Sequence, residues 1–288
     1  MIDFVQLLLL GTVAGMTIFL GLPVAFLKNV NQQTKSFLNA IAIGILFFLI
    51  IDVFGHAWEV TEESVLSWFA GKTISVNPIA NLSALLGGIA AGLLGLSYYE
   101  TKLFPKVLND GRTKPTIEQG TNKREVPVYN LSIDDMGTYR LAIMIASAIG
   151  AHNFSEGLAI GQSYAAGSIG LAIVLIIGFG AHNATEGFGI SSPLMRLDKR
   201  PSLRFLVGVG LIGGLPTFIG TLVGSLIGMS TFTFILFLSM AGGALVYVSL
   251  LMYSTARRQS NNYVMMLGIF IGLCAGFITD LLITLGGV

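Results

Sequence analysis

The chain has 288 residues, of which 53% are hydrophobic and 11% are charged, and its net charge is +1. Soluble domains contain about 25% charged residues, so this chain lacks the charges needed to cover a water-facing surface, and a mean hydropathy of +0.79 agrees. The small net charge gives no support for nucleic-acid binding. The single cysteine, Cys274, excludes an internal disulfide and a cysteine-based metal site.

Eight stretches of the chain are long and apolar enough to cross a membrane, which takes about 20 mostly apolar residues. Their length and glycine content favour helices over buried strands. We therefore expect an all-α integral membrane protein, with residues 1–288 forming one transmembrane domain in the bilayer of the cell (plasma or inner) membrane. The stretches lie at residues 4–27, 36–58, 79–101, 138–165, 169–191, 203–228, 231–255 and 262–286.

The connections between these stretches predict the topology. Every Lys and Arg except Lys72 lies in or beside an odd-numbered connection. The positive-inside rule therefore places the odd connections in the cytoplasm and both termini outside. The third connection, 103–137, is polar and contains three prolines, so we expect a cytoplasmic loop that divides the helices 3+2+3. The second connection, 59–78, is expected to be an outer loop with an acidic start.

A repeated octet marks the centre of the chain. It reads GAHNFSEG at 150–157 and GAHNATEG at 180–187, an offset of 30 residues with two differences. In each copy the His and the Glu are four residues apart, so both side chains lie on the same face of a helix. The duplication places two of the three histidines of the chain beside two glutamates.

The two copies are predicted to lie at the same depth in the membrane. Their stretches are joined at Gly167–Gly170, and residue 169 is midway between the two motif centres. His152 follows Arg140 by twelve residues, which is about 18 Å at 1.5 Å per residue. An antiparallel helix pair would therefore bring both copies together near the middle of the bilayer.

Two glutamates at this depth need a compensating cation. A charged side chain at the bilayer centre costs at least about 2.5–3.5 kcal/mol, and neither motif contains a basic residue other than histidine. Two carboxylates would repel each other or bind a proton, whereas a divalent cation would be a partner for both. We predict a metal site formed by the two imidazoles, the two carboxylates and the adjacent amides, namely His152, Glu156, His182, Glu186, Asn153 and Asn183.

The ligand types limit the metal. Imidazole and carboxylate suit first-row divalent ions, whereas Cu(I) prefers sulfur, and Ca²⁺ and Mg²⁺ prefer shells of oxygen. We expect Zn²⁺ first, with Fe²⁺, Mn²⁺ and Cd²⁺ as alternatives. A protonated network of Glu and His packing between two helices is the other interpretation, but it leaves the duplication of the motif unexplained.

A second polar cluster lies toward the outer end of the 36–58 stretch. Asp52, His56 and Glu59 have the spacing i, i+4 and i+7, which places them on one helix face. They would either form an acidic funnel that collects cations or be ordinary polar residues at a helix end. Asp280 is a lone acid in the last stretch, more typical of a hydrogen bond between helices.

The motif His152-Asn153-Phe154-Ser155-Glu156-Gly157 resembles the H-N-x-P-E-G signature of the ZIP (Zrt/Irt-like) family of divalent-metal transporters. The resemblance implies metal transport toward the cytoplasm through the stretches 36–58, 138–165, 169–191 and 231–255. It also implies a primary site at His152, Glu156, His182 and Glu186. In this family a second metal is often bound, here by Asn153, Asn183 and the same two glutamates. A homodimer is compatible with the sequence.

Three departures from the family pattern affect this expectation. The motif proline is replaced by Ser155 and Thr185, which favours straighter helices. Asn183 stands where some relatives have an acid, and Leu215 stands where some relatives have a metal-binding glutamate before the proline. We therefore predict one metal ion per chain.

Two other classes of protein bind metal in membranes. A metalloprotease would need an H-E-x-x-H motif, and a di-iron oxidase would need four carboxylates and two Glu-x-x-His motifs; the sequence has neither. A metal sensor would bind the ion without transporting it.

Overall fold

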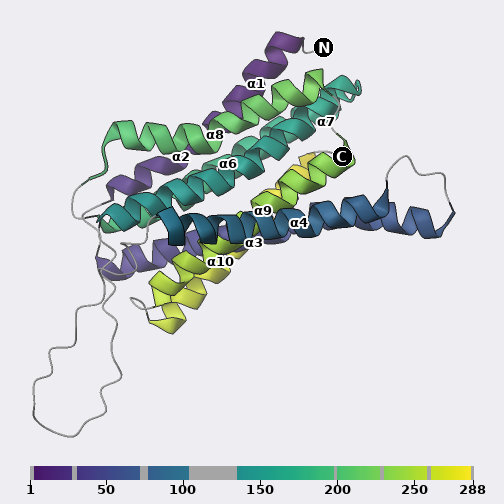
Figure 1. The fold of residues 1–288 in the computed structure, drawn as a ribbon. Coiled ribbons are helices and arrows are strands. Elements are labelled where there is room, and N and C mark those ends of the chain that lie inside the picture. Colours follow the sequence, from purple (N-terminus) through teal and green to yellow (C-terminus); the bar gives the residue numbers. More distant parts are fainter. Residues whose placement is uncertain are drawn as a thin grey trace, which may run out of the picture.

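The computed structural model describes residues 3–27, 31–71, 77–103, 135–197, 200–227, 230–257 and 261–286, and these form helices and short connections without a strand (Figure 1). This confirms the all-α class. The expected cytoplasmic loop, 103–137, lies outside the described residues except at its two ends. The elements are α1 (Phe4–Met16), α2 (Ile18–Gly21), the 3₁₀ helix η1 (Leu22–Phe26), α3 (Gln32–Phe69), α4 (Pro78–Leu103), α6 (Asp135–Ala165), α7 (Ile169–Ser191), the 3₁₀ helix η2 (Ser192–Arg196), α8 (Leu203–Leu226), α9 (Thr231–Arg257) and α10 (Asn262–Gly286).

Seven segments of the described chain are long and apolar enough to cross a membrane. They correspond to α1 with α2 and η1, to α3, to α4, to α7 with η2 as far as Met195, and to α8, α9 and α10. The eighth long helix, α6, has 31 residues but also carries polar motif residues and Arg140. These helices confirm a multi-pass membrane protein, while the 3+2+3 arrangement and the outer position of both termini stay predictions.

The second connection is shorter than expected from the sequence. The structure extends α3 to Phe69, so the acidic start of the expected outer loop lies on this helix, as the helix face predicted for Asp52, His56 and Glu59 requires. The segment after Trp58 contains no proline or glycine before Gly71, which has a positive φ of 64°. Nothing therefore stops the helix until a residue that favours the left-handed conformation is reached.

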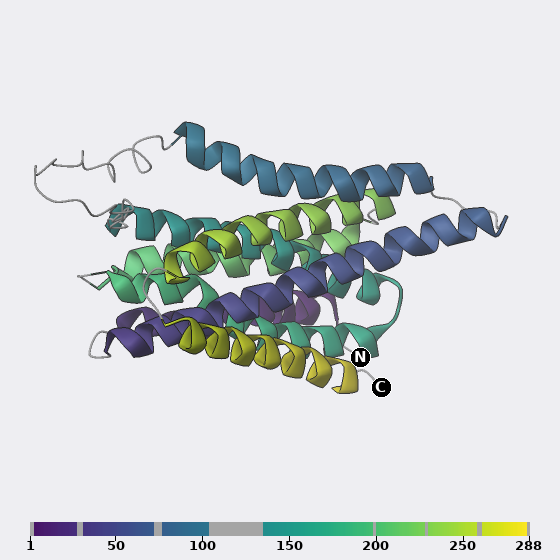
Figure 2. The same cartoon turned by 90° about the horizontal axis from the view of Figure 1, so that it is seen from below.

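The helices pack in two groups (Figures 1 and 2). In one group α6 packs along α8, and α1 and α2 pack on α7 and α8. In the other, α4 packs on α9 and α3 packs on α10 and α9. Contacts of α6 with α9, and of α7 with α3 and α10, join the groups. The motif helices α6 and α7 therefore stand where the two groups meet.

Glycines allow α6 and α8 to approach closely. A Cβ atom at Gly157 would collide with the carbonyl oxygen of Thr217, and one at Gly220 would collide with that of Phe154. Small residues give this contact in membrane helices because lipid provides no hydrophobic force to press helices together. These close contacts fix the position of α6 along the axis of α8.

The core lies between the two groups, where α3 and α6 contribute the fully buried side chains of Ile43, Leu46, Ile145 and Ile149. Many large apolar side chains instead face outward, for example Leu94 on α4, which is 62% exposed. In water such a surface would be a liability, but lipid tails cover it without cost.

Candidate metal centre

The two motif copies face each other across the α6–α7 pair. The helices are joined by a tight turn with Gly167 at a φ of 77°, so the predicted helix hairpin is confirmed. The positive φ explains why a glycine stands at this position. His152, Asn153, Glu156, His182, Asn183 and Glu186 are all buried, none of them more than 6% exposed.

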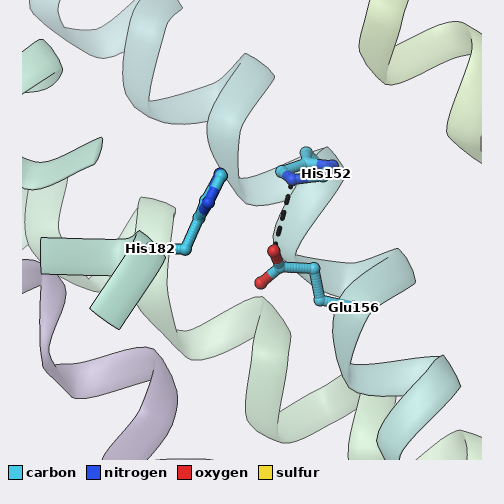
Figure 3. Close-up of side chains that lie close together, drawn as sticks. All are labelled: His152, Glu156 and His182. Atoms are coloured by element: carbon cyan, nitrogen blue, oxygen red, sulfur yellow. Dashed lines mark ion pairs between the residues drawn. The ribbon is translucent and has the colours of Figure 1, made fainter. Parts of the chain in front are cut away.

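Imidazole and carboxylate groups from both copies converge on one point. The ligand atoms of His152, Glu156 and His182 all lie within 4.8 Å of one another (Figure 3). Nε2 of His152 is 3.3 Å from Oε1 of Glu156 and 3.9 Å from Oε1 of Glu186. Nε2 of His182 is 3.8 Å from the same Glu186 oxygen. His152, Glu156 and His182 therefore form one close group, and Glu186 lies beside both imidazoles without being part of that group.

Several atoms of this group lack hydrogen-bond partners among the described residues. They include Nε2 of His152, Nε2 of His182, Oε2 of Glu156 and Oε1 of Glu186. Buried polar atoms in proteins nearly always have a partner, and a cluster of unpartnered nitrogen and oxygen atoms is costly in a membrane interior. The donor set of two imidazoles and two carboxylates fits a divalent transition metal.

The two asparagines form a hydrogen-bonded bridge between the helices. Nδ2 of Asn153 donates to Oδ1 of Asn183 at 2.6 Å, to Oε2 of Glu186 at 2.9 Å and to the carbonyl oxygen of Gly213 at 3.0 Å. Nδ2 of Asn183 donates to the carbonyl oxygen of Ala14 at 3.0 Å. Carboxylate and carbonyl oxygens only accept, so these partners determine which way each amide faces.

The bridge separates the roles of the two amides. Both polar atoms of Asn183 are engaged by protein groups. By contrast, Oδ1 of Asn153 is buried and has no hydrogen-bond partner in the described part of the chain. Asn153 thus retains an oxygen that can face a cation, whereas Asn183 is held in a hydrogen-bond network.

Helix α8 reaches the site through its backbone. The carbonyl of Gly213 accepts from Asn153, while the side chain of Leu215 is 38% exposed on the outside of the helix. The sequence analysis gave Leu215 no metal-binding role, and the Gly213 contact was not predicted from the sequence. Pro216 does not mark this contact, because a helical proline removes the hydrogen bond to the carbonyl four residues earlier, which is that of Ile212.

The first span supports the second motif copy. It is broken between α1 and α2 at Thr17, whose hydroxyl donates to the carbonyl of Gly180 at 2.5 Å. Further along, the hydroxyl of Ser191 donates to the carbonyl of Gly21 at 3.0 Å. These contacts could not be predicted from the sequence, because a hydrogen bond between residues more than 160 positions apart depends on tertiary packing.

On the other side of the site, Phe48 of α3 packs against His182, with ring centroids 5.8 Å apart. This aromatic ring covers the imidazole with an apolar surface. A dry environment strengthens the attraction between a bound cation and its ligands.

The second polar cluster lies on α3 apart from the four ligands. Nδ1 of His56 lies 3.4 Å from Oδ1 of Asp52. The Asp52 side chain is 19% exposed and the His56 side chain is 63% exposed. Glu59 is exposed. Asp52 is near enough to His152 and His182 to interact with them electrostatically, so the cluster extends from an exposed surface toward the buried site.

Comparison with known proteins agrees with the site. A family model described as ZIP zinc transporter matches residues 109–284, more than half of the chain. A search of curated proteins gives no match. Family members are transporters of divalent metals and not enzymes, which removes the metalloenzyme alternative. With the His and Glu groups of both motif copies gathered in the membrane-spanning bundle, the chain belongs to the ZIP zinc transporter family.

Proposed function

We propose that the protein moves Zn²⁺, and with lower preference Fe²⁺, Mn²⁺ and Cd²⁺, across the cell membrane into the cytoplasm. The ion would bind His152, Glu156, His182 and Glu186. The observation that carries this proposal is the convergence of His and Glu ligand atoms from both motif copies at one buried point. Family membership supports divalent metal as the substrate class.

The chemistry of the site suits transient binding. Two carboxylates neutralise the dication, and two neutral imidazoles complete a shell of mixed nitrogen and oxygen ligands. Each ligand is at most 6% exposed, so an ion in this site is closed off from water. Release then requires α3, α4, α9 and α10 to move relative to the group that contains α6 and α7, which would open the site to water.

We propose one ion per chain at this site. A second ion beside Glu156 and Glu186 would need oxygen ligands from the asparagines. The Asn183 oxygen already accepts from Asn153, and its nitrogen donates to Ala14. Binding a second ion would therefore break buried hydrogen bonds, and leaving a buried amide without a partner costs about 1–3 kcal/mol.

The approach path for the ion would run along α3. Asp52, His56 and Glu59 provide carboxylate and imidazole groups between the exposed helix end and the buried site. An Asp52→Asn variant would then raise the metal concentration required for half-maximal uptake and leave the amount of metal bound at saturation unchanged.

The proposed direction rests on the resemblance to the ZIP family, and the positive-inside rule predicts the orientation, with odd connections in the cytoplasm and both termini outside. The homodimer stays a prediction, and the mass of the protein in detergent micelles tests it.

The test is Zn²⁺ uptake into proteoliposomes by the wild type, Glu156→Ala and a control, Glu63→Ala, which removes an exposed carboxylate of α3. We expect uptake by the wild type and the control, and none above background by Glu156→Ala. Equal uptake by all three would overturn the site. Metal bound without uptake by the wild type would identify a sensor. Competition among Zn, Fe, Mn, Co and Cd ions would rank the substrates.

A further inference from the structure

An apolar layer closes the metal centre on the side of η2, which is the side predicted to face the cytoplasm. On α7, Gly189 follows His182 by seven residues, about 10 Å along the helix. A Cβ atom at Gly189 would lie 3.8 Å from Leu46 of α3 and 4.0 Å from Ile149 of α6, and both of these side chains are fully buried. An ion that leaves the site in this direction therefore meets packed apolar side chains.

Beyond this layer, a buried hydrogen bond joins the two groups of helices. The hydroxyl of Ser192, the first residue of η2, donates to Oδ1 of Asn39 on α3 at 3.3 Å. Both residues are at most 2% exposed. Because η2 follows α7 directly and packs on α3 and α6, this bond crosses the boundary at which the two groups meet. It must break if α3 is to separate from η2.

The polar groups of α3 at this boundary are only partly satisfied. Nδ2 of Asn39 has no hydrogen-bond partner among the described residues, and the same is true of the hydroxyl of Ser36. Ser36 lies three residues before Asn39 on the same helix face and is 3% exposed. Burial of such groups is unfavourable, whereas water would hydrate them once α3 had separated from η2. The hydrogen bond therefore favours the closed arrangement, and the unpartnered groups favour the open one.

We propose that Asn39 and Ser192 form the gate that controls release of the ion on the side of η2. The inference rests on the proposed transport of Zn²⁺ and adds two residues outside the metal centre to it. The hydrogen bond of the pair holds the gate closed. When α3 separates from η2, the amide of Asn39 and the hydroxyl of Ser36 bind water, which lowers the cost of wetting a path that is otherwise apolar. The pair thus sets how often the path is open.

Cysteine labelling of the purified protein measures how often the gate opens. A Gly189→Cys variant that also carries Cys274→Ala has its only thiol in the apolar layer, where a water-soluble maleimide reaches it when the gate is open. Adding Ser192→Ala should raise the labelling rate about tenfold, because Oδ1 of Asn39 then lacks a partner in the closed state. Adding Asn39→Leu as well should return the rate to its starting value or below, because no unpartnered group of the pair remains.

This reversal separates a gate from a general loss of stability, since a second substitution in a merely structural contact would not restore slow labelling. Arg200→Cys, exposed before α8, is the control, and its labelling rate should be the same with and without the gate substitutions. Retained metal binding shows that each variant is folded. Unchanged labelling in Ser192→Ala, or labelling of the Asn39→Leu and Ser192→Ala combination as fast as in Ser192→Ala alone, would overturn the proposal.

A disulfide across the gate tests its part in transport. Oxidation of a variant with Asn39→Cys and Ser192→Cys should stop Zn²⁺ uptake into proteoliposomes, and reduction should restore it. The matched control joins α4 to α9 within one group through Ala84→Cys and Ser239→Cys, where the Ser239 hydroxyl donates to the Ala84 carbonyl at 3.2 Å; its oxidation should leave uptake unchanged. Uptake that continues with the gate cross-linked would overturn the proposal. Absence of uptake by the wild type would instead overturn the proposed function, and the labelling rates would still decide whether the pair controls access to the site.

Discussion

Asn153 and Asn183 occupy the same position in the two motif copies, and their side chains contact each other directly, with Nδ2 of Asn153 2.6 Å from Oδ1 of Asn183. The pair continues to Glu186 on one side and to the backbone of Ala14 on the other. One repeated residue type thus connects the first span, both motif helices and a proposed ligand.

Asn153→Ala should weaken metal binding without unfolding the protein. The change removes the donor that orients Glu186, and removing such a supporting contact lowers metal affinity by about 10- to 100-fold. The measurement is Zn²⁺ affinity by titration of the purified protein. Asn81→Ala is the control, because Asn81 is equally buried but lies on α4. If Asn153→Ala binds Zn²⁺ with the same affinity as the wild type, the hydrogen bond from Asn153 does not orient Glu186 for metal binding.

The metal content of the purified, Zn²⁺-saturated protein should be one ion per chain by elemental analysis. Both polar atoms of Asn183 are already hydrogen-bonded, and α8 offers a leucine at position 215. Glu186→Ala should bring the content close to zero, because it removes a carboxylate next to both imidazoles. A content near two, reduced by Asn153→Ala, would refute the prediction of a single ion.

Gly187→Ala should destabilise the protein. A Cβ atom at this position collides with the carbonyl oxygen of Ile18, and overpacking typically costs about 1–3 kcal/mol. Gly95→Ala is the matched control on α4, because no described atom lies within 4 Å of its added Cβ. Alanine there should leave stability unchanged or raise it by up to about 1 kcal/mol through helix propensity. Thermal unfolding in detergent compares the two, and an equal melting temperature for both would disprove the close contact.

Labelling of single cysteines tests the topology in a background without Cys274. Ala166 lies in the exposed turn between α6 and α7. The cysteine of an Ala166→Cys variant should therefore react with an impermeant maleimide added to intact cells. Arg200 is exposed just before α8. The cysteine of an Arg200→Cys variant should react with the maleimide only after the membrane is permeabilised. The reverse pattern would contradict the proposed orientation of the chain in the membrane.

The sequence alone predicted the helices with good accuracy, since a run of apolar residues long enough to span lipid has few alternatives to a helix. The stretch expected at 169–191 coincides with α7. The predicted end of α3, residue 58, was eleven residues short of the observed end at Phe69. A polar helix that continues beyond the apolar stretch has a composition similar to that of a loop. The pairing of the motif copies was also predictable, because a short turn at Gly167 allows only an antiparallel pair.

What the sequence determined was therefore local: residue types, their spacing along a helix, and the symmetric placement of two His and Glu pairs about one turn. Only the tertiary structure decided that the Gly213 carbonyl and Ala14 backbone hold the asparagines, that Leu215 points outward, and that Phe48 covers His182. These contacts join residues far apart in the chain. They depend on how closely glycine-rich helix faces approach, and no local pattern of residues specifies that distance.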